Sequence, residues 1–282
     1  MIRPRNKQTP ADVAAHYDTL DPFYREIWGE HVHHGYWKTG RETPEAAASA
    51  LVDLVADRLD LMPGQVICDI GCGYGATAQA LATTHDVAVT GITLSAVQYA
   101  LAAQRVASRG ALTFEVGNWL TNSFSSNSFD RAYAIESTEH MDDKALCFAE
   151  AFRVLRPGGR LVVCAWLASD APRPWHARHL LEPICREGRL PELGTETEFV
   201  DLLRGSGFAV TKVEDISFAV RRTWSICVQR GLRKLATSSR YQRFMLRSDA
   251  RDRVFAATLF RLLLAFRAGA MRYAVLSAMK AD

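Results

Sequence analysis

The sequence contains no apolar stretch near the roughly 20 residues that a membrane-spanning helix needs, so we expect no transmembrane segment. Its first residues carry charges with no apolar run behind them, which excludes the pattern of a secretory signal. The six cysteines form no C-x-x-C pair and no zinc-ligand pattern. We therefore expect free thiols and a cytoplasmic protein, because disulfides are rare in that reducing compartment.

Acidic residues are scarce in the last part of the chain. From residue 219 onward the sequence has 14 Lys and Arg but 3 Asp and Glu, so the net charge of +3 conceals an asymmetry. The basic part predicts contact with an anionic group of a substrate, peripheral contact with an anionic membrane, or a solvated helix surface. No nucleic-acid-binding motif accompanies this charge, and we expect no nucleic-acid partner.

Apolar residues make up 48% of the 282 residues, which suits one α/β domain with an appended cap. Short apolar runs alternate with helical stretches, a pattern typical of a parallel sheet with crossover helices. The predicted strands lie at 65–70, 87–92, 112–117, 131–136, 160–166, 209–217 and 271–280. We predict an α/β, Rossmann-like fold with a seven-stranded, mostly parallel sheet and helices on both faces.

The helical stretches divide the chain into four predicted parts. Residues 1–62 form an N-terminal helical segment, residues 63–219 the Rossmann-like core, residues 220–268 a basic helical cap, and residues 269–282 the last strand. The cap is thus inserted before the last strand. An apolar stripe in it predicts packing on the body or the wall of an apolar site, and comprises Phe255, Leu259, Leu262, Leu263 and Phe266.

The strongest local signal is DIGCGYG at residues 69–75, between a predicted strand and a predicted helix. Glycine is needed where φ is positive or where a ligand approaches the backbone closely, and the helix that follows offers free N–H groups. Gly71, Gly73 and Ala76 also satisfy the dinucleotide pattern GxGxx(G/A). That pattern expects an acidic residue about 20 positions later, and residues 91–95 (GITLS) contain none, which disfavours a nicotinamide enzyme.

Several further motifs follow one another at a definite spacing. They are HYD at 16–18, FYREIWGEHVHHGYW at 23–37, DIGCGYG, GITLSAVQ at 91–98, EVGNW at 115–119, FDRAYAIESTEHMDDK at 129–144 and FRVLRPGGRLVV at 152–163. With this order the chain resembles class I S-adenosylmethionine-dependent methyltransferases of the tocopherol/sterol type. It looks most like γ-tocopherol methyltransferases and bacterial natural-product relatives. The resemblance covers residues 16–165 almost without a gap.

The resemblance implies S-adenosylmethionine as the cofactor. It implies that the following residues bind it: Tyr17, Trp37, Asp69, Gly71, Cys72, Gly73, Thr93, Leu94, Gln98, Asn118, Trp119 and Glu136. The residues of the glycine loop would line the methionine part. The hydroxyl and amide in TLSxxQ would replace the usual acid at the ribose hydroxyls, since these need donors and acceptors rather than charge. Asn118 and Trp119 would flank the adenine.

The N-terminal segment would fold over this cofactor through Tyr17 and Trp37. A sulfonium is a cation without N–H donors, so aromatic faces and oxygen atoms are what can hold it. Packing in the core stays an alternative for both residues and for Trp119. The histidines at 31, 33 and 34 suggest a metal site, but no carboxylate or cysteine stands at a familiar ligand spacing, and we expect no metal.

Acid–base candidates follow the fourth predicted strand, where strand ends face the ligand crevice. Glu136, Glu139 and His140 lie there, and we assign Glu136 and His140 as the catalytic residues. A phenol loses its proton as it attacks, and a base helps that step. His140 fits by its ordinary pKa, and Glu136 fits if burial raises its pKa. Capping or structural roles remain open for both.

The function predicted from these residues is methyl transfer from S-adenosylmethionine to a small lipophilic or natural-product acceptor, at a phenolic oxygen. Methylation of a prenyl diphosphate, an aromatic carbon or a nitrogen is the alternative, and a non-catalytic cofactor-binding regulator is a second. The acceptor would be apolar and could carry an anionic group held by the basic cap. A homodimer is compatible with the sequence.

Overall fold

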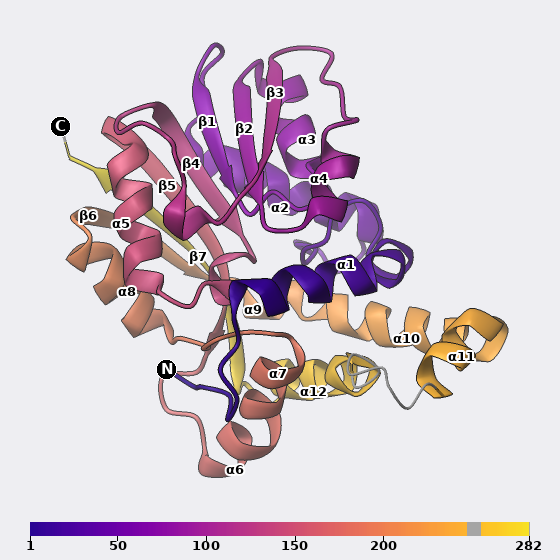
Figure 1. The fold of residues 1–282 in the computed structure, drawn as a ribbon. Helices are drawn as coiled ribbons and strands as arrows, with labels where there is room; N and C mark the ends of the chain where they lie inside the picture. Colours follow the sequence, from indigo (N-terminus) through magenta and orange to yellow (C-terminus); the bar gives the residue numbers. More distant parts are fainter. Residues whose placement is uncertain (247–254, 282) are drawn as a thin grey trace.

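The computed structural model describes residues 1–246 and 255–281 (Figure 1). These residues form a seven-stranded sheet with the order β3-β2-β1-β4-β5-β7-β6. The strands are β1 Val66–Ile70, β2 Ala88–Thr93, β3 Ala111–Val116, β4 Phe129–Ile135, β5 Leu155–Ala168, β6 Phe208–Asp215 and β7 Met271–Lys280. Each overlaps a strand predicted from the sequence.

The sheet is parallel except for β7, which runs antiparallel to both of its neighbours, β5 and β6. Successive strands proceed from β1 to one edge of the sheet, and the chain then returns to β4 on the other side of β1. At such a reversal the loops at the carboxyl ends of the strands part and leave a crevice. The predicted Rossmann-like fold is therefore confirmed, and the glycine loop lies at this reversal.

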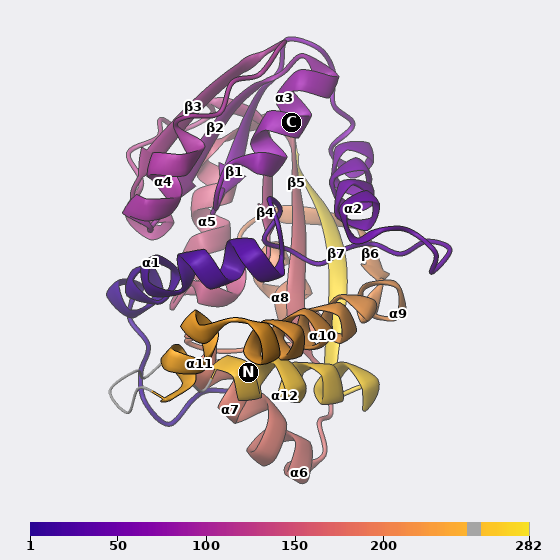
Figure 2. The same cartoon turned by 90° about the vertical axis from the view of Figure 1, so that its right-hand side faces the viewer.

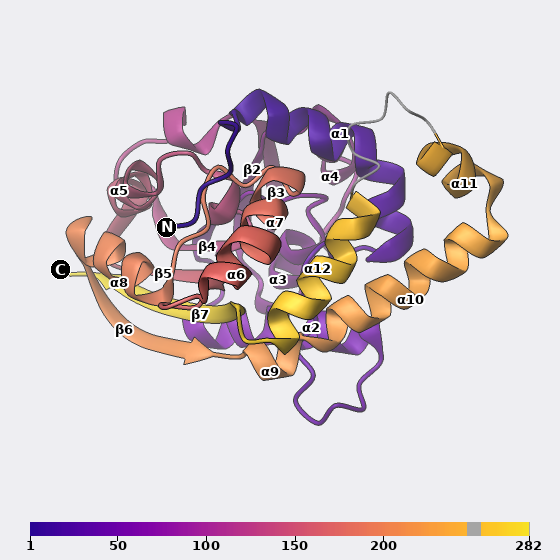
Figure 3. The same cartoon turned by 90° about the horizontal axis from the view of Figure 1, so that it is seen from below.

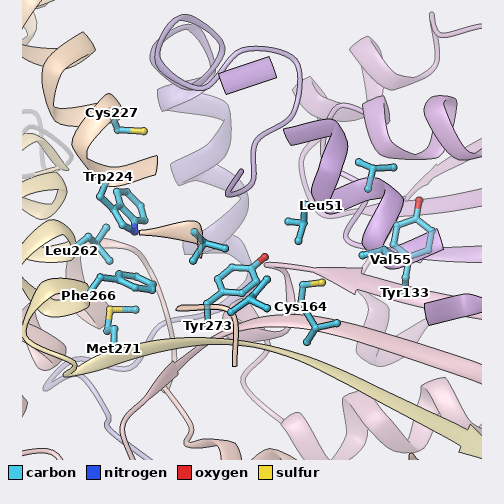
Figure 4. Packing of buried hydrophobic residues seen from close by; sticks show 14 of the residues in the cluster. Leu51, Val55, Tyr133, Cys164, Trp224, Cys227, Leu262, Phe266, Met271 and Tyr273 are labelled. Atoms are coloured by element: carbon cyan, nitrogen blue, oxygen red, sulfur yellow. The ribbon is translucent and has the colours of Figure 1, made fainter. Parts of the chain in front are cut away.

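Residues that alternate along a strand point to opposite faces of the sheet, and helices cover the apolar side chains on both faces. Ile67 packs in a cluster with the helices α2 (Pro44–Leu59) and α3 (Ala76–His85). Its neighbour Cys68 packs in the second cluster with α5 (Lys144–Val154) and α8 (Glu196–Gly205). The short α4 (Ala96–Ala102) covers β2 and β3. Figure 4 shows part of the first cluster, which continues from the sheet into the cap.

The first helix, α1 (Pro10–Ile27), lies across the carboxyl ends of the strands, above the cap (Figure 2). Thr9 and Asp12 form a reciprocal capping box that fixes where it begins. Two short 3₁₀ helices follow β3 and β4, at Trp119–Thr121 and Thr138–His140. In the part of the chain that the structure describes, no helix is both long and apolar enough to cross a membrane.

The cap between β6 and β7 contains α9 (Ser217–Val220), α10 (Arg222–Thr237), α11 (Ser239–Leu246) and α12 (Phe255–Arg267). Residues 247–254 of the predicted cap, 220–268, lie outside the described residues. The predicted apolar stripe faces the body, because the side chains of Leu259, Leu262 and Phe266 are buried and Leu263 is half-buried. The side chain of Phe255 is not among those described.

A second helical segment joins the cap, although it lies within the predicted core. It comprises α6 (Pro174–His176), a π-helical stretch at Ala177–Leu181 and α7 (Glu182–Glu187), between β5 and α8. It packs beside α12, as Figure 3 shows from below. Thr258 of α12 donates a 2.6 Å hydrogen bond to Glu187, and Arg261 forms an ion pair with the same carboxylate.

Several cations of the cap contact acidic groups and carbonyl oxygens of the body. Lys234 and Arg240 both pair with Glu26 of α1, at 2.6 and 3.0 Å. Arg230 donates to the carbonyl oxygen of Ile27 at 2.7 Å. These contacts hold α10 and α11 against α1, so part of the charge asymmetry in the sequence serves the docking of the cap.

Candidate active site

The glycine loop turns sharply between β1 and α3, and all three of its glycines have positive φ. A Cβ on Gly71 would lie 2.4 Å from the Cβ of Ser137, so the close approach of the loop after β4 requires glycine there. A Cβ on Gly73 would meet nothing within 4 Å, because this residue faces open space. Gly71 therefore serves packing, whereas Gly73 keeps a cavity free.

That cavity, which we call the glycine-loop cavity, opens between the glycine loop and α1 and has a volume of about 810 Å³ when the solvent-open space at its mouth is included. The cofactor-binding residues predicted from the sequence that line it are Tyr17, Gly71, Gly73, Thr93, Leu94, Gln98, Asn118, Trp119 and Glu136. The hydroxyl of Thr93 donates to the Gln98 side-chain oxygen at 2.8 Å. This bond fixes the polar pair at the end of β2, where a ribose would need it.

Trp119 and Trp37 occupy different surroundings. The indole of Trp119 lines the cavity but is buried, and its Nε1 donates to the carbonyl oxygen of Cys147 at 3.0 Å. The indole of Trp37 packs against Gly35, and its Nε1 donates to the carbonyl oxygen of Glu42 at 3.2 Å. Trp37 therefore lines none of the three cavities of this region, in contrast to the other residues that were predicted to bind the cofactor.

A smaller space of about 370 Å³, the histidine cavity, continues beyond Gly71 and Gly73. Asp69 and Cys72 line it, together with His31, His33 and Thr77. Burial raises the pKa of Asp69 to about 7, although the Tyr133 hydroxyl, which donates to it at 2.7 Å, favours the ionised form. The glycine loop thus separates two connected spaces, one lined by the ends of β2 and β3 and one by the histidines.

A third space of about 570 Å³, the aromatic cavity, lies between α1 and the cap. Its lining is dominated by aromatic and aliphatic side chains, namely Tyr17, Tyr24, Trp28, Val32, Trp166, Ile184, Leu190, Trp224 and Leu262. Glu136, Glu139 and His140 are its ionisable residues, and no Lys or Arg lines it among the described residues. Four residues line this space and the glycine-loop cavity alike, which makes the two cavities neighbours: Tyr17, Val32, Glu136 and His140.

Glu136 stands at the end of β4 with a φ of 53° and a carboxylate surrounded by donors. Its Oε1 accepts from the backbone N–H of His34 at 2.7 Å, from His34 Nδ1 at 2.9 Å and from the Tyr273 hydroxyl at 2.8 Å. Its Oε2 accepts from Trp166 Nε1 at 2.8 Å. Burial alone would raise the pKa of Glu136, but His34 and its hydrogen bonds outweigh burial and hold this pKa below its usual value.

His34 keeps Glu136 ionised, so this carboxylate is poorly suited to take a proton. Its four hydrogen bonds instead make it an anchor. The imidazole of His34 is fully buried among the rings of Trp166, Trp224, Phe266 and Tyr273, with centroids 5.0 to 5.5 Å away. Glu136 therefore ties the segment around His34 to β5, to β7 and, through these rings, to the cap.

His140 is the better-placed base. Its Nε2 lies 2.8 Å from the Tyr17 hydroxyl, and its Nδ1 lies 3.4 Å from the carbonyl oxygen of Arg189. The tautomer with a proton on Nδ1 satisfies both contacts and leaves Nε2 as an acceptor. Burial first, and the neighbouring His16 second, lower the pKa of His140 to about 4. The imidazole is therefore neutral near pH 7, and its Nε2 lone pair, which accepts from the Tyr17 hydroxyl, lies at the junction of the two cavities.

The sequence analysis named Glu139 as an acid–base candidate without assigning it as catalytic, and the structure gives its carboxyl a distinct state. Its carboxyl is buried in the wall of the aromatic cavity, where it accepts from the backbone N–H of Trp166 and from the Thr138 hydroxyl. Burial raises the pKa of Glu139 to about 7. The sequence analysis also did not identify three aromatic residues of the site, because β5, β7 and α10 come together only in the folded protein. They are Trp166, Trp224 and Tyr273.

The donor set suits an organic cofactor rather than a metal ion. Within residues 1–246 and 255–281, no group of three or more His, Cys, Asp or Glu is arranged to hold a metal. A positively charged nucleoside fits better, because the glycine-loop cavity combines a side-chain-free floor at Gly73, the Thr93–Gln98 pair and the ionised Glu136. Aromatic and anionic groups are what a sulfonium requires.

Comparison with known proteins adds an independent observation. The family model described as "Mycolic acid cyclopropane synthetase" matches residues 4–247. The chain is 34% identical over 236 residues to the 27-O-demethylrifamycin SV methyltransferase of Amycolatopsis mediterranei (strain S699), covering 82% of this chain and 86% of that protein. It is 27% identical over 291 residues to the chloroplastic tocopherol O-methyltransferase of Arabidopsis thaliana, covering 95% and 81% of the two chains.

Among solved structures, the crystal structure of the [4+2]-cyclase SpnF is similar with a TM-score of 0.83 and 28% sequence identity. The similarity covers 100% of this chain and 99% of that one, so the N-terminal helix and the cap are part of the shared architecture.

Proposed function

Because the chain belongs to the mycolic acid cyclopropane synthetase family and is an S-adenosylmethionine-dependent methyltransferase, we propose that its acceptor is a neutral, largely aromatic or apolar molecule with a hydroxyl group, of which a phenol is the best case. Membership of the family confirms the resemblance drawn from the motifs. Bound in the glycine-loop cavity, S-adenosylmethionine supplies an electrophilic methyl group on a positively charged sulfur.

The observation that carries this proposal is the composition of the aromatic cavity beside the glycine loop. Its described lining offers aromatic faces, aliphatic groups, two carboxyl groups and one neutral imidazole, but no Lys or Arg. A diphosphate would meet carboxylates where it needs cations, because anionic groups are recognised by Arg and Lys. A phenol meets no such conflict, so the lining favours O-methylation over the prenyl diphosphate alternative.

We propose that the chemistry is divided among three residues. His140 accepts the hydroxyl proton on Nε2 as the acceptor oxygen forms its bond to the methyl carbon and the sulfur keeps the electron pair of the broken bond. Tyr17, which hydrogen-bonds to that nitrogen here, gives way to the acceptor hydroxyl. Glu136 keeps its charge and faces both cavities. Orientation supplies much of the remaining acceleration, since the sulfonium is already a good leaving group.

The acceptor class is tested with a panel of lipophilic phenols, matched anilines and prenyl diphosphates, using methyl-labelled S-adenosylmethionine. We expect methyl ethers from the phenols at rates at least tenfold above those for the other classes. Mass spectrometry of the products distinguishes O-, N- and C-methylation. Methylation of a prenyl diphosphate at a rate similar to the best phenol would contradict the proposal.

The role of Glu136 as a fixed negative charge leads to a second prediction. S-adenosylmethionine carries a positive sulfur that S-adenosylhomocysteine lacks, so the ratio of their dissociation constants isolates the effect of charge. We expect Glu136→Gln to raise the ratio of the dissociation constant of S-adenosylmethionine to that of S-adenosylhomocysteine by about three- to tenfold. This is a modest Coulomb effect, because the attraction between the two charges is partly screened. Titration calorimetry measures both constants.

The control for this experiment is Glu214→Gln, which removes a carboxylate that pairs with Arg58 away from the cavities. It should leave the ratio unchanged. An unchanged ratio in Glu136→Gln, with both affinities lowered together, would mean that Glu136 acts only by holding the segment around His34.

The sequence also leads us to propose where the enzyme works and what it contacts. We propose a cytoplasmic location, peripheral contact of the basic helices with an anionic membrane, and a homodimer. Because some basic residues of α10 and α11 form ion pairs with α1, any membrane contact would rely on the remaining exposed cations.

A further inference from the structure

The segment between α7 and α8 has no role in the function proposed so far, although it reaches the acid–base residues. We call residues 188–193 the 188–193 segment. Gly188 and Leu190 line the aromatic cavity. The intervening Arg189 has a φ of 57°, a left-handed conformation that residues other than glycine rarely adopt. Such a conformation persists where the surrounding contacts impose it, and it often marks a functional site.

This turn brings the main-chain carbonyl of Arg189 to His140. His140 Nδ1 lies 3.4 Å from the carbonyl oxygen, which can only accept, so the contact requires the proton of the neutral imidazole on Nδ1. Nε2 is then left to accept the proton of the acceptor hydroxyl. When it does so, the same carbonyl faces the positive charge that forms on the ring. The distance is long for a hydrogen bond, and catalytic contacts of this kind often tighten once a substrate is bound.

Residues 2 and 3 hold the far end of the 188–193 segment. Ile2 and Leu193 form an antiparallel bridge, in which each backbone N–H donates to the carbonyl oxygen of the other residue at 2.8 Å. Arg3 Nε also donates to Glu192 Oε2 at 3.0 Å. Because the side chain of Arg3 is 75% exposed, its ion pair adds little, and the backbone bridge is what fixes the segment.

Lys144, the first residue of α5, joins this segment to the turn that carries His140. Its Nζ donates to the carbonyl oxygens of Met141 and Glu192, both at 3.1 Å. Met141 directly follows the 3₁₀ helix that ends at His140. The side chain of Lys144 is buried, and the Glu192 carboxylate lies 3.8 Å from Nζ. A buried ammonium group needs such partners to compensate for its lost hydration, so Lys144 sets the spacing of the two main-chain segments.

We propose that Lys144 is a positioning residue for the methyl transfer: together with the bridge at Ile2, it holds the 188–193 segment so that the Arg189 carbonyl orients His140. Gly188 and Leu190 then form one wall of the aromatic cavity beside the acceptor. The inference rests on the proposed role of His140 as the base. It gives a function to a buried lysine that lines neither the glycine-loop cavity nor the aromatic cavity.

The pKa of His140 reports whether the segment is in place. Burial lowers this pKa to about 4, and His16 and Lys144 act in the same direction. A loosened segment admits water, and the pKa then rises toward the ordinary value of about 6.5. Because a base must be deprotonated, kcat/KM then falls as the pH decreases through that value. The titratable groups around His140 are His16, Tyr17 and Tyr24 of α1, Glu136, Glu139 and Asp142 after β4, and Lys144 of α5.

The experiment measures kcat and kcat/KM for a lipophilic phenol between pH 5.5 and 8. Lys144→Met removes the donor at nearly constant side-chain volume, and Ile2→Pro removes the N–H of the bridge at a residue that lines none of the three cavities. We expect kcat at pH 7.5 to fall about tenfold in Lys144→Met and about threefold in Ile2→Pro, because the base is misplaced. Both variants should also lose about three- to tenfold in kcat/KM between pH 7.5 and 5.5. The full chain and Ile2→Val, which keeps the bridge, should show no such loss.

A second comparison separates positioning from a general structural effect. In the His140→Ala background, Lys144→Met should lower kcat by less than about twofold, because its effect passes through the missing imidazole. Affinity for S-adenosylhomocysteine should change by no more than about twofold in the single variants, because no residue of the 188–193 segment lines the glycine-loop cavity.

Equal losses of kcat from Lys144→Met in the two backgrounds would overturn the inference. So would full rates at both ends of the pH range in Lys144→Met and Ile2→Pro. If the melting curve shows that Lys144→Met does not fold, the comparison of Ile2→Pro with Ile2→Val decides, and equal pH profiles in these two would overturn the inference. Failure of the proposed base would appear separately, as a full rate in His140→Ala itself.

Discussion

Replacing His140 by alanine is expected to lower kcat by about 10²- to 10⁴-fold, the range typical for loss of a positioned general base. The ring nitrogens of His140 contact the Tyr17 hydroxyl and the carbonyl oxygen of Arg189, neither of which belongs to the glycine loop, so this loop should keep its shape. Affinity for S-adenosylhomocysteine should therefore stay within a few-fold. Single-turnover kinetics with a phenol, beside calorimetry with the cofactor product, measure the two quantities.

Tyr17→Phe is the matched control for His140→Ala. It removes the hydroxyl that contacts His140 Nε2 but keeps the aromatic ring, which stacks on Tyr24 with centroids 5.4 Å apart. We expect a much smaller loss of kcat, because the imidazole and its lone pair remain. If His140→Ala keeps the full rate, no proton transfer occurs at this residue, and Glu139 becomes the candidate base.

The pH dependence of kcat/KM distinguishes these two residues. Burial lowers the pKa of His140 to about 4 and raises that of Glu139 to about 7. A base must be deprotonated, so a reaction that depends on His140 keeps its rate down to pH 5.5, whereas one that depends on Glu139 loses rate as pH falls through 7. We expect no acid limb between pH 5.5 and 8 in the full chain or in Glu139→Gln.

The second large effect is expected at the glycine loop. Gly73→Ala places a methyl group in the space that the structure leaves open beside the loop, where no protein atom would meet it. The protein should fold, but a bound cofactor must shift, at an overpacking cost of about 1–3 kcal/mol, or about 5- to 150-fold in affinity. Calorimetry with S-adenosylhomocysteine measures the loss.

The backbone cost of Gly73→Ala is controlled by Gly64→Ala. Gly64 also has positive φ and also faces open space, but it lies in the turn before β1, away from the cavities. Both variants bear the penalty of a left-handed alanine, about 1–2 kcal/mol, so their melting temperatures should fall alike. Only Gly73→Ala should lose cofactor affinity. Equal affinities in the two variants would show that no ligand passes beside Gly73.

The sequence predicted the strands well because they are short apolar runs, and central strands such as β1 and β4 are mostly buried between the helices on the two faces of the sheet. Residues 271–280 were predicted as the last strand, and β7 has those bounds. No local feature of the sequence indicates that β7 runs antiparallel to its neighbours. For that reason the position of Tyr273 in the crevice was not foreseen: in a strand that runs against its neighbours, the first residues lie at the carboxyl ends of the others.

The motifs located the cofactor cavity but not the state of its ionisable groups. Glu136 was predicted to act as a base if burial raised its pKa, yet the neighbouring His34 outweighs burial and holds the pKa low. Whether a buried carboxyl is ionised depends on partners that are distant in the sequence, and His34 lies 102 positions from Glu136. Residues 174–187 were likewise not foreseen as part of the cap, because their contacts are with α12.

We propose that methyl transfer occurs where the glycine-loop cavity and the aromatic cavity meet. The decisive experiment is a crystal structure with S-adenosylhomocysteine and a phenolic acceptor. We expect the sulfur at the junction lined by Tyr17, Glu136 and His140, and the acceptor oxygen within about 2.6–3.2 Å of His140 Nε2. A sulfur turned away from that junction, or an acceptor bound outside the aromatic cavity, would contradict it.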